Sequence, residues 1–418
     1  MSWTHNGAMK LPSFCLLLLI ACAGQAESWP RFRGPTGQGI SAEQGVPLTW
    51  RATENVAWKT EIPGEGWSSP IVWGDHVFIT AALDSGESCR VLALDRKSGV
   101  VLWNTEVFRQ KTKRVQAKNS DATPTPCTDG ERVYAAFGGG GIAALDFAGK
   151  VAWTHQNVRF YSQHGLGASP VLFEDLLIMP FDSSSEGPDK SVGWQKPWDQ
   201  SFILALDAKT GTERWRGQRG MSRIAHGTPI FVKADGRDLM LSNAGDVVQG
   251  FDPRSGERLW SVKAQGEGVV PSLSAGDGLV FSSSGFEKST TRGIRFTPTE
   301  ATIAWEQTKG VPHLPSFIYT GGHLYSITEG GVAMCQRGDT GAIVWQERVG
   351  GTHSASPVLT EGRIYFLAEN GETAVIAATP EFKVLGRNQL GEKCQASLAI
   401  SGGQVFARTE KHLFCIGK

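Results

Sequence analysis

The sequence predicts an all-β fold, an eight-bladed β-propeller of four-stranded antiparallel blades closed by N- and C-terminal strands that share the last blade. Three observations predict it. One strand–turn–strand motif recurs along the chain, its spacing suits a four-stranded blade, and eight strand-like segments begin with a similar opening. Outside the N-terminus no run of residues has helical periodicity.

The motif reads Ala-x-Asp-x-x-x-Gly-x-x-x-Trp. Its Asp can accept hydrogen bonds from backbone N–H groups two residues on, and its Gly supplies the positive φ of a tight turn. Its Trp falls on the outgoing strand, where the ring can pack against a neighbouring unit. The structural residues are Asp95, Gly99 and Trp103; Asp146, Gly149 and Trp153; Asp207, Gly211 and Trp215; Asp252, Gly256 and Trp260; and Gly341 and Trp345.

The motif tryptophans and their equivalents give the repeat length. They stand at positions 58, 103, 153, 215, 260, 305 and 345, with gaps of about 40 to 62 residues. This is the length of one blade, so we expect each unit to be a blade.

A second signal begins each unit. Each unit begins with a small residue, a Ser or Thr, and a Pro. An apolar strand, a Gly/Asp turn and a second strand follow, and both strands alternate apolar and polar residues. Clear examples lie at Ser69, Thr125, Ser169, Thr228 and Ser356, and looser ones lie near Pro271, Pro315 and Ala396.

The last unit is incomplete. Residues 394–418 supply about three strands, so we expect residues 55–59 to supply the fourth and close the ring, which would hide two open sheet edges. Residues 51–418 are therefore expected to form one domain, preceded by an extension over residues 27–50.

The N-terminal residues 1–26 are typical of an export signal. A basic start at Met9-Lys10, with Met9 as a possible true start, precedes an apolar run that is short for a membrane span. Two cleavage sites compete. Leu19 to Cys22 resembles a lipobox, which would make Cys22 the lipidated first residue, and Gly24 to Ala26 resembles an ordinary signal peptidase site. The protein is expected to be periplasmic, anchored to the outer membrane through Cys22, or secreted.

Five cysteines remain beyond this segment, without the spacing of a zinc or redox motif. Cys394 and Cys415 fall in one predicted blade and could pair, because exported proteins can hold disulfides. The favoured interpretation is that most of the five are small buried strand residues.

With these motifs in view, the chain resembles the PQQ-like, or quinoprotein-type, β-propeller repeat family. Its export signal and unit count resemble the outer-membrane assembly lipoproteins of the BamB type, and Trp29 to Pro35 (WPRFRGP) resembles the opening of many such repeat proteins. This resemblance implies a non-catalytic scaffold that binds another envelope protein, such as the outer-membrane β-barrel assembly machinery.

The family also contains quinoprotein dehydrogenases, which would make the chain an enzyme with PQQ and calcium at the central channel. Those enzymes carry an adjacent Cys-Cys pair over the quinone and a carboxylate set for calcium. The chain has no Cys-Cys pair, and its motif aspartates already serve turns. We therefore nominate no catalytic, cofactor or metal residue.

Three long segments are expected on one face of the propeller, where loops carry function. Residues 109–118 include Lys111, Lys113 and Arg114, residues 182–200 include Trp194 and Trp198, and residues 285–293 form the third. Exposed Trp beside basic charge is typical of a protein-binding surface. Alternatively, the Trp-bearing insertion folds back over the third blade. A polysaccharide-binding module could use the same aromatic residues.

The charge composition narrows the class of molecule that could be a partner. Lys and Arg number 41 against 41 Asp and Glu, and this balance argues against nucleic acid. We expect a monomer that contacts membrane only through a lipid anchor.

Three histidines, His226, His313 and His353, lie at or just before innermost strands and are expected at the channel mouth. Three imidazoles there could bind a metal or an anion. Ordinary polar loop residues are the favoured interpretation.

Overall fold

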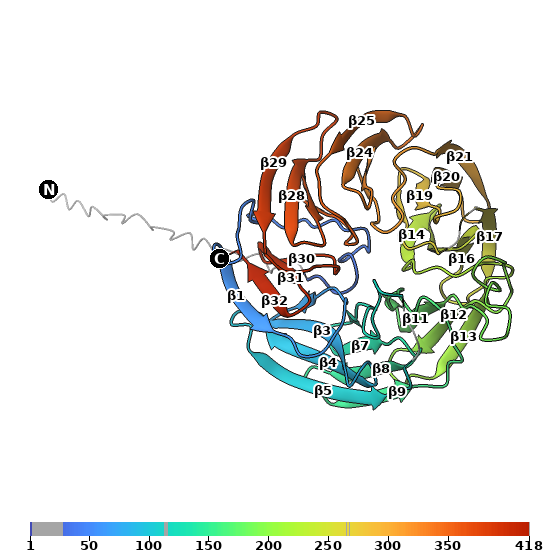
Figure 1. The fold of residues 1–418 in the computed structure, drawn as a ribbon, viewed down its shortest axis with the longest axis horizontal. Helices are drawn as coiled ribbons and strands as arrows, with labels where there is room; N and C mark the ends of the chain where they lie inside the picture. Colours follow the sequence, from blue (N-terminus) through green and yellow to red (C-terminus); the bar gives the residue numbers. More distant parts are fainter. Residues whose placement is uncertain (2–27, 113–115, 265, 267, 418) are drawn as a thin grey trace.

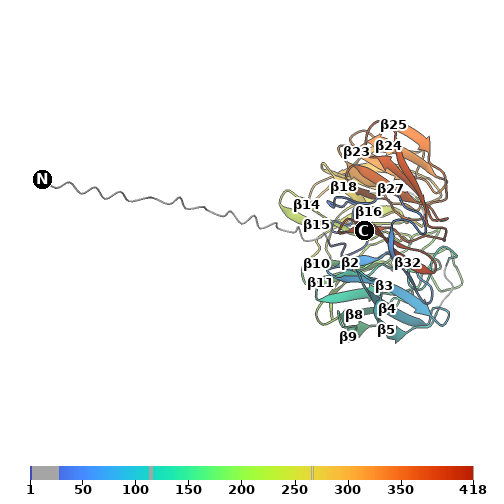
Figure 2. The same cartoon turned by 90° about the vertical axis from the view of Figure 1, so that its left-hand side faces the viewer.

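The computed structural model describes residues 1, 28–112, 116–264, 266 and 268–417. Within these ranges all regular structure is β-strand, arranged as eight four-stranded antiparallel sheets. The sheets follow one another around a ring in Figure 1 and form a disc in the side view of Figure 2. The predicted eight-bladed β-propeller is confirmed. In the described part of the chain, no helix is long and apolar enough to cross a bilayer.

The first four blades run in chain order from the innermost strand outward. Their strands are β2 (Ile71–Trp73), β3 (His76–Leu83), β4 (Ser88–Asp95) and β5 (Val101–Arg109); β6 (Cys127–Thr128), β7 (Arg132–Ala136), β8 (Ile142–Asp146) and β9 (Val151–His155); β10 (Val171–Phe173), β11 (Leu176–Phe181), β12 (Phe202–Asp207) and β13 (Glu213–Gln218); and β14 (Ile230–Ala234), β15 (Arg237–Ala244), β16 (Val247–Phe251) and β17 (Arg258–Lys263).

The next three blades repeat this order, and the eighth combines the two ends of the chain. Their strands are β18 (Ser274–Gly276), β19 (Leu279–Ser283), β20 (Thr291–Phe296) and β21 (Ala301–Gln307); β22 (Ile318–Thr320), β23 (His323–Ile327), β24 (Val332–Arg337) and β25 (Ile343–Arg348); β26 (Val358–Thr360), β27 (Arg363–Leu367), β28 (Glu372–Ala377) and β29 (Val384–Gln389); and β30 (Ala399–Ser401), β31 (Gln404–Arg408), β32 (His412–Ile416) and β1 (Val56–Glu61).

The ring closes in the eighth blade as predicted. Strand β1 pairs antiparallel with β32, placing Trp58 opposite Cys415 and Glu61 opposite His412. In Figure 1 these first and last strands lie side by side in blue and red. Lys59 of β1 also donates to Glu392 at 2.7 Å, which adds an ion pair to the seam.

Five tryptophans pack against the motif Gly of the next blade: Trp58, Trp103, Trp153, Trp215 and Trp305. The Nε1 of Trp153, for example, donates to the Ala208 carbonyl at 3.0 Å, and Gly211 of that turn has φ +73°. Four further indoles make the equivalent bond at 2.8 to 3.2 Å: Trp58, Trp103, Trp305 and Trp345. The motif Asp shapes the turn, as at Asp207, whose Oδ1 accepts the backbone N–H of Thr210 at 2.9 Å. These contacts agree with a structural role for the motif.

Residues 29–44 cross the inside of the ring, and we call this segment the N-terminal strap. Trp29 exchanges two backbone hydrogen bonds of 2.9 Å with Val72 of the first blade. Leu359 of the seventh blade donates to Gly39 at 2.7 Å, and Gly402 of the eighth donates to Glu43 at 2.7 Å. One short segment thus bonds to the inner strands of several blades.

Arg33 anchors the strap near its middle. Its side chain is 1% exposed and donates to backbone carbonyls of Leu273 at 3.4 Å and Gln38 at 2.8 Å, and to that of Phe317. Burial lowers the pKa of Arg33 to about 9. All three acceptors are backbone carbonyls and none is a carboxylate. The Arg33 guanidinium therefore joins the strap to the fifth and sixth blades by donating to backbone carbonyls.

All five cysteines in the described part of the chain are buried free thiols, so the pairing considered for Cys394 and Cys415 is not formed. Cys415 lies inside β32 between β1 and β31, whereas Cys394 precedes the first strand of the blade. The interpretation as small buried residues agrees with this placement. Cys22 and the rest of the predicted export signal lie outside the described residues.

Candidate functional site

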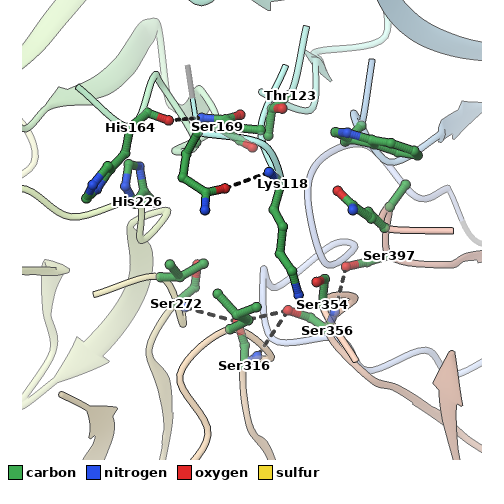
Figure 3. A pocket seen from close by; sticks show the side chains of 18 of the residues that line it. Lys118, Thr123, His164, Ser169, His226, Ser272, Ser316, Ser354, Ser356 and Ser397 are labelled. Atoms are coloured by element: carbon green, nitrogen blue, oxygen red, sulfur yellow. Dashed lines mark hydrogen bonds between the residues drawn. The ribbon is translucent and has the colours of Figure 1, made fainter. Parts of the chain in front are cut away.

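Eight hydroxyl groups, one from the opening of each blade, form a closed ring around the axis. The backbone N–H of each residue donates to the hydroxyl of the next at 2.9 to 3.1 Å, and Ser397 returns to Ser69. The members are Ser69, Thr125, Ser169, Thr228, Ser272, Ser316, Ser356 and Ser397. Figure 3 shows Ser272, Ser316, Ser356 and Ser397 in sequence. We call this arrangement the hydroxyl ring.

A cavity of about 540 Å³ lies at the hydroxyl ring. Seven ring residues line it, all except Thr228. Trp67, Trp194 and Phe286 contribute aromatic walls, and Phe32 of the strap also lines it. Its volume falls within the range of about 300–1,000 Å³ for small-molecule sites. We call it the channel cavity.

Lys118 spans the channel cavity. In Figure 3 it extends from the side of Ser169 to that of Ser354. Its Nζ donates to Glu369 at 2.8 Å, and the same carboxylate accepts the Ser354 hydroxyl. Burial raises the pKa of Glu369, but the hydrogen bonds from Lys118 and Ser354 outweigh it and lower the pKa. The positive charge of Lys118 is therefore already balanced by the Glu369 carboxylate.

Two histidines line another side of the channel cavity. The rings of His164 and His226 lie 6.3 Å apart, and Trp194 meets His164 edge-on at 5.6 Å. Burial lowers the pKa of both, that of His226 to about 3, where the neighbouring His164 contributes further. Both imidazoles are therefore neutral near pH 7.

The three nominated histidines do not converge on one site. His226 lines the cavity, whereas His313 bonds Ser289 at 2.7 Å and lies 3.5 Å from Glu329. His353 is buried, with its ring nitrogens facing two backbone carbonyls. Among the described residues no group of three His, Cys, Asp or Glu side chains could hold a metal ion.

The nominated loop residues lie in two places. Trp194 lines the channel cavity, while Lys111 and Trp198 line a separate groove of about 1110 Å³ formed by the first three blades. We call this the peripheral groove. Trp194 and Trp198 are both half-buried, and the Trp198 indole donates to the Ser183 carbonyl at 2.7 Å. Neither indole therefore projects freely into solvent. Lys113 and Arg114 lie outside the described residues.

The insertion that carries both tryptophans folds back onto the β13–β14 connection. Trp198 pairs with Ser222 through two backbone bonds of 2.9 and 3.0 Å, and Ile224 donates to Gly193 at 2.7 Å. This placement corresponds to the alternative in which the insertion covers the scaffold. It explains how two nearby tryptophans can line different hollows.

Sequence reasoning missed two features of the site. The Ser and Thr residues of the strand openings form a ring that was not predicted, although their recurrence at one place per blade is a signal for it. The strap residues Phe32 and Arg33 belong to the family-like opening, and no local sequence signal indicates that they cross the ring.

Comparison with known proteins places the chain in a family. The family model described as outer membrane protein assembly factor BamB matches residues 42–171, 199–318 and 294–382. The chain belongs to the BamB family. No curated protein sequence matches it significantly.

Several solved structures share the fold of this chain. BamB from Moraxella catarrhalis has a TM-score of 0.60 at 15% identity, over 87% of this chain and 97% of that one. The computationally designed Ika8 protein has 0.60 at 11% identity, over 89% and 99%. A europium-containing methanol dehydrogenase has 0.52 at 12% identity, over 93% and 89%. At these identities the likeness concerns the fold alone.

The channel cavity does not fit PQQ with calcium. That quinone carries three carboxylates, whereas Lys118 is already paired with Glu369 and both lining histidines are neutral. The lining carboxylate Glu329 accepts two backbone N–H groups. A calcium site needs several converging hard oxygen ligands, including carboxylates, and the described lining provides no such cluster.

Proposed function

We propose that the protein is a non-catalytic, exported scaffold that binds another envelope protein at the peripheral groove. BamB-family membership supports this assignment. The partner in this proposal is the outer-membrane β-barrel assembly machinery, chiefly the periplasmic domains of its barrel subunit. The protein itself would be monomeric and periplasmic, and it would use no quinone cofactor.

The observation that carries the proposal is the composition of the peripheral groove. Four cations line it, Arg109, Lys111, Arg159 and Arg216, against the two acids Glu186 and Asp199. Arg109 and Arg216 have carboxylate partners nearby, whereas Lys111 and Arg159 have none in the described part of the chain. An acidic segment of a partner would therefore gain two ion pairs without competing for them.

Aromatic side chains give the same groove an apolar component. Phe160, Tyr161, Trp198 and Phe202 line it, and the Arg216 guanidinium lies 4.2 Å from the centre of the Phe202 ring. Aromatic and Arg side chains dominate the energetics of protein interfaces because they combine large buried area with directed polar contacts. The groove thus favours an acidic segment that also carries apolar side chains.

A capture experiment tests the proposal. The double variant Lys111→Glu/Arg159→Glu should recover at least tenfold less of the barrel subunit from envelope extract, identified by mass spectrometry, because two attractions become repulsions. The matched control Lys150→Glu/Lys209→Glu reverses two exposed cations on turns of the opposite face. Equal recovery with both double variants, or no barrel subunit with the wild type, would refute the assignment.

Two further measurements test the proposed export and the proposed lack of quinone-dependent catalysis. Mass spectrometry of the mature N-terminus distinguishes an acylated Cys22 from cleavage after Ala26. Addition of PQQ and Ca²⁺ to the purified protein should produce neither bound quinone absorbance nor dye-linked alcohol oxidation, and either signal would overturn the non-catalytic assignment.

A further inference from the structure

The hydroxyl ring presents unused donors to the channel cavity. Each hydroxyl oxygen accepts a backbone N–H, so its own O–H remains available to donate. Ser356 donates to Ser316 at 3.0 Å, but the other six ring hydroxyls that line the cavity have no acceptor among the described residues. These six are Ser69, Thr125, Ser169, Ser272, Ser316 and Ser397. The cavity therefore favours a ligand with several acceptor oxygens.

The cavity also presents an unused acceptor. Gln395 is 9% exposed and lines the cavity, and its Oε1 has no hydrogen-bond partner in the described part of the chain. A buried amide oxygen without a partner is costly, so a donor on a ligand would be favoured there. A ligand that only accepts hydrogen bonds, such as a carboxylate, would leave Gln395 unsatisfied.

Charge in the cavity favours a neutral ligand. Lys118 is paired with Glu369 at 2.8 Å, and Glu329 accepts the backbone N–H groups of His313 and Leu314. Arg33 of the strap is committed to backbone carbonyls. Lys118 is the one Lys or Arg among the described lining residues and is already paired, so the lining offers an anion no free counter-charge in return for its lost hydration. The nearby Lys393 ammonium is not part of the lining and lies against the Trp67 ring.

Aromatic walls complete the chemistry. Trp67 and Trp194 line the cavity together with the ring hydroxyls, and the Lys393 ammonium lies 5.2 Å from the Trp67 ring. An apolar ring face beside neutral donors and an acceptor matches a sugar, whose C–H face packs on aromatic rings while its hydroxyls both donate and accept. A purely apolar ligand would leave the hydroxyl donors and the Gln395 acceptor unused, and an anion would find no free cation in the lining.

We propose that the channel cavity is a binding site for a neutral mono- or disaccharide, or for the end of a neutral glycan chain. The aromatic walls would pack against the apolar face of the sugar ring. The ring hydroxyls would donate to sugar oxygens, and Gln395 would accept from a sugar hydroxyl. This site is separate from the peripheral groove, so it stands independently of the proposed protein partner.

Saturation-transfer difference NMR tests this site directly. The probes are maltose, cellobiose, lactose, mannobiose and chitobiose, each at a large molar excess over the protein, and acetate and glutarate serve as anionic comparisons. We expect at least one disaccharide to bind and neither anion to do so. Absence of transfer to all five sugars, or binding of the anions alone, would overturn the proposal.

Variants then locate the bound sugar. Trp194→Ala removes an aromatic wall, and Gln395→Leu removes the free acceptor without touching the insertion, so each should weaken binding about tenfold. The matched control Gln195→Leu alters an exposed residue of the same insertion that lines neither hollow, and it should bind as the wild type does. Unchanged affinity in both cavity variants, with folds verified by circular dichroism, would refute the site.

Discussion

The turn that receives Trp153 offers a quantitative test of how neighbouring blades are joined. Gly211 has φ +73°, and a Cβ added there would lie 2.5 Å from Cε3 and 2.6 Å from Cδ2 of the Trp153 ring. A left-handed conformation costs an L-residue about 1–2 kcal/mol, and overpacking adds about 1–3 kcal/mol. Gly211→Ala should therefore destabilise the protein by about 2–5 kcal/mol.

A matched glycine separates the two costs. Gly236 has φ +78° but no atom within 4 Å of an added Cβ. Gly236→Ala should thus cost only the conformational term of about 1–2 kcal/mol. The excess loss at Gly211 measures the contact with Trp153.

Urea unfolding followed by circular dichroism gives both free energies. In a Trp153→Val background the excess cost of Gly211→Ala should disappear, because the ring that the methyl group meets is gone. Equal destabilisation by Gly211→Ala and Gly236→Ala in the wild-type background would refute the argument that this ring restricts the turn.

Two further predictions concern titratable groups. Burial raises the pKa of Glu392, but hydrogen bonds from Lys59, Thr409 and His412 outweigh it and lower the pKa to about 2. The resulting stability is present above the unfolded-state pKa of about 4.3 and lost as pH falls through the folded-state value. In urea unfolding, Glu392→Gln should be less stable than wild type at pH 7 and should approach it near pH 2; a constant difference would contradict this. Burial raises the pKa of Cys394 and of Cys415 to about 12, with Glu392 contributing at Cys394 and Arg96 opposing at Cys415. In a chain lacking residues 1–27, all five thiols should resist a thiol reagent at pH 8 and react after unfolding, whereas rapid reaction of the folded protein would disprove their burial.

The blades could be predicted from the sequence because local signals specify each of them. The Asp, Gly and Trp of the motif act within one turn and its neighbour, so their spacing carries the information needed. Closure by β1 was also predictable, since the final unit leaves an unpaired edge and residues 55–59 form an unassigned strand-like segment that can cover it.

The site was less predictable because its contacts join distant residues. Arg33 reaches Leu273 across 240 positions, and Lys118 reaches Glu369 across 251. Trp194 and Trp198 are close in the sequence but line different hollows. The direction of each indole depends on how the insertion packs on Ser222 and Ile224. Local composition does not encode this packing.

Pairing of β1 with β32 also constrains biosynthesis. Strand β1 cannot acquire its neighbour until β32, more than 300 residues later, has been made, and the bond from Ser397 to Ser69 has the same dependence. Loop-closure entropy makes such distant pairing slow. A newly made chain therefore remains open at one edge until β32 has been made, and a product truncated before β32 would expose that edge to aggregation or proteolysis.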